Sequence, residues 1–196
     1  PVAPPPTLRI VLSTRPGRPL DESRRRGWDE LTVRPLGIEQ RSQLVGDYLR
    51  GYRKTLSPGR MARIVEAPHA GNPLFLRILL DELRLWGSNE QLDSAIERYL
   101  DVQTLDDLFE RVLARWECDY EQPRPGLVRD TMTAIWASRR GLDETELLAI
   151  LGEPGRPLPR AHFSPLHLAA ASSLVSRSGR IGFAHDLLRI GVRDRY

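Results

Sequence analysis

Lysine and cysteine are almost absent from this chain of 196 residues. Cys118 is the only cysteine, which excludes an internal disulfide framework and a multi-cysteine metal site. Lys54 is the only lysine, so arginine supplies nearly all of the 29 basic residues. The chain also lacks a signal-peptide pattern and any apolar run long enough to span a bilayer, and we therefore expect a cytoplasmic location with no membrane partner.

The shortage of lysine bears directly on nucleotide binding. A phosphate-binding P-loop has the pattern G-x-x-x-x-G-K-[ST]. Gly46 and Gly51 have the required separation, but Tyr52 follows the second glycine and Lys54 comes two residues late. Apolar residues in this stretch recur at helical spacing. The sequence therefore predicts an amphipathic helix over residues 38–52 and no P-loop of its own.

The N-terminal part, residues 1–36, is rich in proline and has one strand-like segment. Leu8–Thr14 is apolar and partly β-branched, and Arg15-Pro16-Gly17 ends it. Because a lone strand is unstable, we expect it to belong to a sheet formed by other parts of a longer protein. Residues 18–27 are polar and predict a loop, and residues 31–33 predict a second short strand.

Residues 37–122 are helical in pattern almost throughout. The predicted helices cover residues 38–52, 61–65, 73–86, 92–99 and 105–116, with Thr104 as an N-cap for the last. The helix that begins at Pro73 is the most apolar, as expected for the central element of a bundle.

The proline-rich stretch 122–126 is the predicted boundary to a last domain, residues 123–196. Helices are predicted over residues 127–138, 143–151 and 165–172, the second opened by a capping box of Asp143 and Glu146. A hairpin over residues 174–183 turns at Ser178-Gly179, and a helix from Asp186 to Tyr196 closes the chain. This order is typical of a winged helix, so the predicted fold class is mainly α.

The sequence contains little that points to catalysis. The four histidines have no metal-ligand spacing, and no serine lies in a G-x-S-x-G pattern. We therefore predict no catalytic residue and no metal site.

Three short segments, here called signatures, are informative when they are considered together. Ser13-Thr14-Arg15 ends the predicted strand, where an arginine can meet a phosphate. Gly71-Asn72-Pro73-Leu74 opens the most apolar helix, and the flat ring of a proline can pack on adenine. His185-Asp186 precedes the last helix, where exposed N–H groups favour an anion. Each also has a plain interpretation: a surface arginine, a helix start and a helix cap.

Together these segments resemble the STAND NTPases, signal-transduction ATPases of the AAA+ superfamily that include NACHT and NB-ARC proteins. The likeness is nearest to their nephrocystin-like branch and covers nearly the whole chain. It implies that residues 1–36 end an NTPase domain, that residues 37–122 form an AAA+ lid-like helical domain, and that residues 123–196 form a winged helix. Walker A and Walker B motifs are missing, so the resemblance implies an ATPase only for the parent protein.

The resemblance also implies roles for individual residues. Arg15 matches a sensor arginine facing the γ-phosphate, Pro73 a proline near adenine, and His185 a histidine that contacts the β-phosphate of ADP. The residues implied in nucleotide binding are Thr14, Arg15, Gly71, Asn72, Pro73, Leu74, His185 and Asp186. The cofactor would be ATP or ADP, with magnesium in the parent protein, and this part alone would hold none tightly.

These implications predict a regulatory switch that closes over a nucleotide held by an upstream P-loop domain. The implied partners are that domain, a downstream repeat domain of the TPR or WD kind, and further copies of the protein on activation. Two alternatives remain open. A winged helix could bind nucleic acid through its arginines, namely Arg177, Arg180, Arg189, Arg193 and Arg195. The chain could also be a structural adaptor between an effector and repeats.

Overall fold

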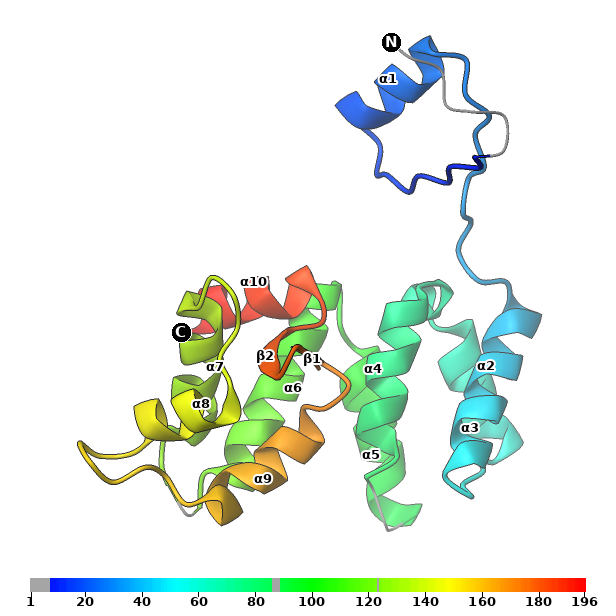
Figure 1. Ribbon diagram of the computed structural model, residues 1–196. Coiled ribbons are helices and arrows are strands. Elements are labelled where there is room, and N and C mark those ends of the chain that lie inside the picture. Colours follow the sequence, from blue (N-terminus) through cyan, green and yellow to red (C-terminus); the bar gives the residue numbers. More distant parts are fainter. Residues whose placement is uncertain (1–7, 86–88, 123) are drawn as a thin grey trace. The chain divides into compact units, whose positions relative to one another are not determined.

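The computed structural model describes residues 8–85, 89–122 and 124–196 and divides into two compact units (Figure 1). Unit 1 comprises residues 1–34 and unit 2 comprises residues 35–196. Each unit is described by itself. In the described residues, no helix is both long and apolar enough to cross a membrane.

Unit 1 differs from the sequence-based prediction. Neither residues 8–14 nor residues 31–33 form a strand, and Val11, Leu31 and Val33 are about nine-tenths exposed, at 94%, 91% and 90%. A strand needs a neighbour for its backbone N–H and C=O groups, and the described residues of unit 1 offer none. The expected remnant strand of an α/β domain is therefore wrong for this structure.

The predicted loop at residues 18–27 is also wrong, because it contains helix α1 (Arg18–Arg25). Pro19 lies in the first turn, where its missing N–H costs nothing. Glu22 accepts hydrogen bonds from Arg25 at 2.8 and 2.7 Å and from Arg26 at 2.7 Å, so side chains three and four residues apart support the helix. No residue of α1 is buried, which is why its sequence has no apolar periodicity to predict it.

The first part of unit 2 confirms the predicted run of helices. They are α2 (Ile38–Gly51), α3 (Pro58–Glu66), the short 3₁₀ helix η1 (Pro68–Gly71), α4 (Pro73–Leu83), α5 (Asn89–Leu100) and α6 (Leu105–Tyr120). Because Gly46 and Gly51 both lie within α2, this stretch is not a P-loop. Thr104 caps α6 as expected, since its hydroxyl accepts a hydrogen bond from the Asp107 N–H at 3.1 Å. The predicted end of the third helix, Trp86, lies outside the described residues.

The second part of unit 2 contains three helices, a hairpin and a last helix. Their bounds are α7 (Leu127–Ala137), α8 (Glu144–Leu151), α9 (Arg160–Ala169), β1 (Leu174–Arg177), β2 (Arg180–Phe183) and α10 (Asp186–Arg195). The Asp143–Glu146 capping box of α8 is confirmed. In Figure 1, α10 crosses the upper edge of unit 2, where it packs on α6 and α7.

The hairpin forms as predicted, whereas α9 begins at an earlier residue than predicted. Strand β1 pairs with β2 in antiparallel register from Leu174 opposite Phe183 to Arg177 opposite Arg180. Ser178 and Gly179 both have positive φ, 52° and 79°, which a tight two-residue turn requires. Helix α9 begins at Arg160, not at Pro165, which lies inside the helix and cannot donate to the carbonyl of Ala161.

A single cluster of buried apolar side chains runs through unit 2, from Val45 in α2 to Val192 in α10. It includes residues on both sides of the stretch 122–126, such as Trp116 and Leu127. The division of this unit into a helical domain and a winged helix stays a prediction.

Helix α4 carries two consecutive carboxylates that are buried, Asp81 and Glu82, 7% and 4% exposed. Asp81 accepts a hydrogen bond from the Tyr48 hydroxyl of α2. Glu82 accepts one from the Tyr99 hydroxyl of α5 at 2.6 Å and pairs with the Arg115 guanidinium of α6, one bond of which is 3.0 Å. Burial, with the charge of Glu82 beside it, raises the pKa of Tyr99, so the tyrosine stays a donor. The two buried carboxylates of α4 therefore both have hydrogen-bond partners on neighbouring helices.

Candidate functional site

Thr14 and Arg15 lie in unit 1, whereas the other six residues implied in nucleotide binding lie in unit 2. Both are exposed, and the Thr14 hydroxyl donates to the Arg15 carbonyl at 3.1 Å. Because no strand precedes them in this structure, the strand-end geometry that suggested a phosphate contact is not formed.

The segment Gly71-Asn72-Pro73-Leu74 forms a turn that leads directly into α4. Asn72 is the N-cap residue, and its side chain accepts a hydrogen bond from the Leu74 N–H at 2.9 Å. Pro73 occupies the first helical position, and its side chain is exposed. The turn thus presents an apolar ring to solvent at the start of a helix most of whose later side chains are buried.

Gly71 is buried because two other segments approach it closely. The Leu36 N–H donates to the Gly71 carbonyl at 2.8 Å. A Cβ atom at this position would lie 3.0 Å from Nη2 of Arg41 and 3.1 Å from Cβ of Pro35. The segment that precedes α2 therefore packs against the turn, and the position favours glycine for reasons of space.

His185 and Asp186 lie at the N-terminal end of α10. His185 is the N-cap residue, is half-buried and makes no side-chain capping bond. Asp186 is exposed in the first turn, where its negative charge complements the helix dipole. The imidazole can therefore donate to a ligand, and Asp186 has a sufficient structural role as a first-turn acid.

Two of the three signatures thus occupy the same kind of position, the N-terminal end of a helix. In Figure 1 the N-terminal ends of α4 and α10 both lie towards the upper edge of unit 2. Unpaired N–H groups and the helix dipole give such ends a partial positive charge that favours anions. For phosphate chemistry, the donor set of His185 and the α10 N–H groups fits, and Pro73 fits the apolar face of a base.

Sequence reasoning missed Arg41, which joins three segments beside the turn. Its Nε donates to the Leu36 carbonyl and its Nη1 to the Val65 carbonyl, both at 2.8 Å. One signal could have found it: an arginine in the first turns of a helix opposes the helix dipole and so suggests another role.

The arginines of the predicted nucleic-acid face are largely engaged within the protein. Arg180 pairs with Glu146 at 3.1 Å, Arg193 with Asp194 at 2.7 Å, and Arg195 with Glu117 at 2.5 Å. The Arg195 guanidinium lowers the pKa of Glu117, which keeps that carboxylate charged. These neighbouring carboxylates reduce the positive field that phosphates would need.

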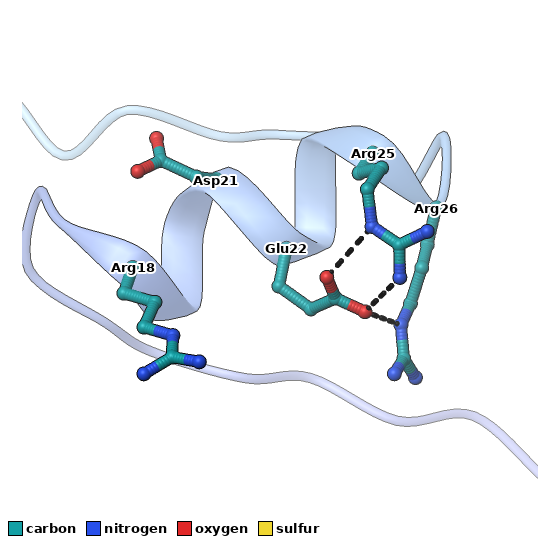
Figure 2. Close-up of a pocket in the computed structure, with 5 residues that line it drawn as sticks. All are labelled: Arg18, Asp21, Glu22, Arg25 and Arg26. Carbon is teal, nitrogen blue, oxygen red and sulfur yellow. Dashed lines mark hydrogen bonds and ion pairs between the residues drawn. The ribbon is translucent and has the colours of Figure 1, made fainter.

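A charged hollow of about 380 Å³ lies on α1 in unit 1 (Figure 2). Its lining side chains are Arg18, Asp21, Glu22, Arg25 and Arg26. The hydrogen bonds of Arg25 and then of Arg26 lower the pKa of Glu22 from 4.5 to about 2. All five side chains come from α1 and its C-cap residue, and the two carboxylates offset much of the positive charge. The hollow therefore does not offer a set of side chains arranged to bind a ligand.

The curated proteins that the chain matches include a TPR repeat-containing protein. The chain is 30% identical over 187 residues to a TPR repeat-containing protein from Dictyostelium discoideum. The match covers 95% of this chain but only 11% of that protein, so the chain spans about a tenth of the relative's length. No family model matches the chain, and no solved structure gives a significant match. The chain is therefore similar to a short segment of a much longer protein that contains TPR repeats.

Proposed function

We propose that this chain is the regulatory part of a nucleotide-dependent switch of the STAND type. In this proposal unit 1 is the end of a P-loop NTPase domain, the helices α2–α6 form a lid, and α7–α10 with the hairpin form a winged helix. The nucleotide, ADP or ATP, would be held by the upstream domain, and unit 2 would close over it.

The observation that carries the proposal is the common position of Pro73 and His185. Each lies where a helix of unit 2 begins, and each has an accessible side chain. One offers an apolar ring suited to a base, and the other offers a nitrogen suited to a phosphate. Two groups of complementary chemistry on one unit with a shared core fit a mononucleotide better than they fit a structural adaptor.

The similarity to a TPR repeat-containing protein supports the part of the proposal that concerns a repeat domain. A switch of this kind needs a segment that senses a signal, and repeats are suited to that task because they form extended binding surfaces. We therefore propose a repeat domain in the same protein and self-association of the protein as the output.

The switch would work by differential contact. His185 donates to the terminal phosphate of ADP, so the closed arrangement is favoured while ADP is present. Exchange to ATP changes that contact, and the population shifts towards an open arrangement that exposes the surfaces for self-association. The residues of this chain orient and retain the nucleotide, and they supply no catalytic group.

The test uses the full-length protein with His185→Ala, and His162→Ala on α9 serves as the matched control. We expect the ADP affinity to fall about 10-fold to 100-fold for His185→Ala, as for the loss of a hydrogen bond to a charged group, and the oligomeric fraction to rise. Calorimetric titration and light scattering measure the two. Unchanged ADP affinity and unchanged oligomeric state in His185→Ala would exclude the proposal.

The nucleic-acid alternative is tested separately by titration with duplex DNA at two salt concentrations. Contacts to phosphates must weaken steeply as salt rises. Because Arg180, Arg193 and Arg195 are paired with carboxylates, we expect no binding of that kind.

A further inference from the structure

The connector that opens unit 2, residues 35–37, is fastened to the Gly71 turn by direct contacts. The Leu36 N–H donates to the Gly71 carbonyl at 2.8 Å, and Cβ of Pro35 lies 3.1 Å from the position that a Gly71 Cβ would take. The Gly37 N–H is bonded to the Gln40 side chain at 2.9 Å, so the connector passes directly into the capped start of α2. The path of the connector is thus set by the turn.

Arg41 fixes this arrangement from α2. Its guanidinium donates to the carbonyls of Leu36 and Val65 at 2.8 Å each, and Nη2 lies 3.0 Å from the place of a Gly71 Cβ. One side chain therefore bonds to the connector and to the last turn of α3, and it lies beside the Gly71 turn. We call this set of four residues, Leu36, Arg41, Val65 and Gly71, the Arg41 clasp.

We propose that Arg41 is a positioning residue that couples the connector to the Gly71–Pro73 turn. A ligand on the turn then changes the mobility of Leu36, and a displaced connector changes the turn in return. The inference rests on the proposed function for the identity of the ligand, which is a nucleotide. The coupling itself lies among residues of unit 2.

The geometry favours an arginine over a lysine at this position. A planar guanidinium can donate to two carbonyls at once from fixed directions, whereas the ammonium of a lysine is a point charge on a flexible stem. Gly71 acts from the other side, because an alanine there would press on both Arg41 and Pro35. A substitution at Arg41 and a substitution at Gly71 should therefore each disrupt the clasp on its own.

The first arm of the test measures amide hydrogen exchange in the chain without nucleotide. For Arg41→Gln and for Gly71→Ala we expect exchange of the Leu36 amide to accelerate about 10-fold or more while α6 amides stay protected, and Arg41→Lys should give an intermediate value. The controls are Arg50→Gln, an exposed arginine on the same helix bonded to Asp47, and Gly46→Ala, whose Cβ would meet nothing within 4 Å. Unchanged exchange at Leu36 would overturn the clasp. An equal acceleration at Leu36 and in α6 would mean that Arg41 only stabilises the fold, and it would also overturn the inference.

The second arm adds ADP to the full-length protein. We expect ADP to slow exchange at Leu36 in the wild-type protein and to have no such effect in Arg41→Gln, although ADP still binds. If ADP binds and Leu36 exchange is unaffected in the wild type, the coupling is wrong while the proposed function stands. If ADP does not bind the wild type, the proposed function fails, and the nucleotide-free arm still decides whether the clasp exists.

Discussion

Unit 1 and unit 2 use apolar residues in opposite ways. In unit 1 Val11 and Leu31 are more than nine-tenths exposed, at 94% and 91%, and α1 buries no side chain. In unit 2 Phe75, Leu79 and Leu113 are fully buried in one cluster. The difference teaches that an apolar segment becomes a structural element only where a second layer covers it, because burial supplies most of the free energy of folding.

The largest effect on the free energy of unfolding is expected when the buried ion pair of unit 2 is broken. Arg115→Met leaves Glu82 buried without its cation and should cost about 4 kcal/mol of unfolding free energy. The corresponding change in unit 1, Arg24→Met, removes an exposed ion pair with Glu30 and should leave the unfolding transition unchanged. Chemical denaturation measures both. The double variant Glu82→Leu with Arg115→Met should recover only part of the loss, because it also leaves the buried Tyr99 hydroxyl without its acceptor. No recovery at all would contradict the pairing.

The next prediction tests the core itself. Leu113→Ala removes a fully buried side chain from α6 and should cost about 3 kcal/mol, from lost transfer energy and the cavity left behind. Val11→Ala in unit 1 should change the unfolding free energy by less than about 0.5 kcal/mol. Comparable losses for the two variants would mean that unit 1 is covered in solution.

A smaller effect comes from the helix caps of unit 2. Thr104→Ala removes the hydroxyl that accepts the Asp107 N–H and should cost about 1 kcal/mol. Ser57 is also an N-cap residue, that of α3, but its side chain makes no capping bond. Ser57→Ala should therefore have a smaller effect in thermal denaturation, and an equal loss would show that the hydroxyl bond is not the cause.

The smallest effect concerns α1 and depends on pH. The pKa of Glu22 is lowered to about 2 in the folded chain by Arg25 and Arg26, against an ordinary value of 4.5. The carboxylate therefore supports α1 fully above pH 4.5, and this support is lost as the pH falls from 4.5 towards 2. An NMR titration should place the Glu22 midpoint near 2, and Arg25→Gln should raise it. A wild-type midpoint near 4.5 would mean that Arg25 and Arg26 do not pair with Glu22 in solution.

The sequence predicts elements well where the signal is local. The Ser178-Gly179 turn, the N-cap at Thr104 and the capping box at Asp143 each need only neighbouring residues, and all of them form as expected. The prediction of a strand at residues 8–14 was wrong because strand formation depends on a distant partner. Helix α1 was missed because ion pairs, not apolar periodicity, support it.

The candidate site was predictable only in part. Its turn and its histidine could be read from short patterns, since each begins a helix. The place of Arg41 in the first turns of α2 could have drawn attention to it, but its bond to Val65 could not be predicted, because the two residues are near in space only through the packing of α2 and α3.

The paired carboxylates of α4 have a mechanical consequence. Asp81 is bonded towards α2, and Glu82 is bonded towards α5 and α6. Aliphatic side chains can slip past one another at little cost, but such directional bonds cannot shift by a residue without breaking. A displacement of one end of the bundle should therefore move α2, α4, α5 and α6 together as a rigid body. Neighbouring helices should not slide past one another.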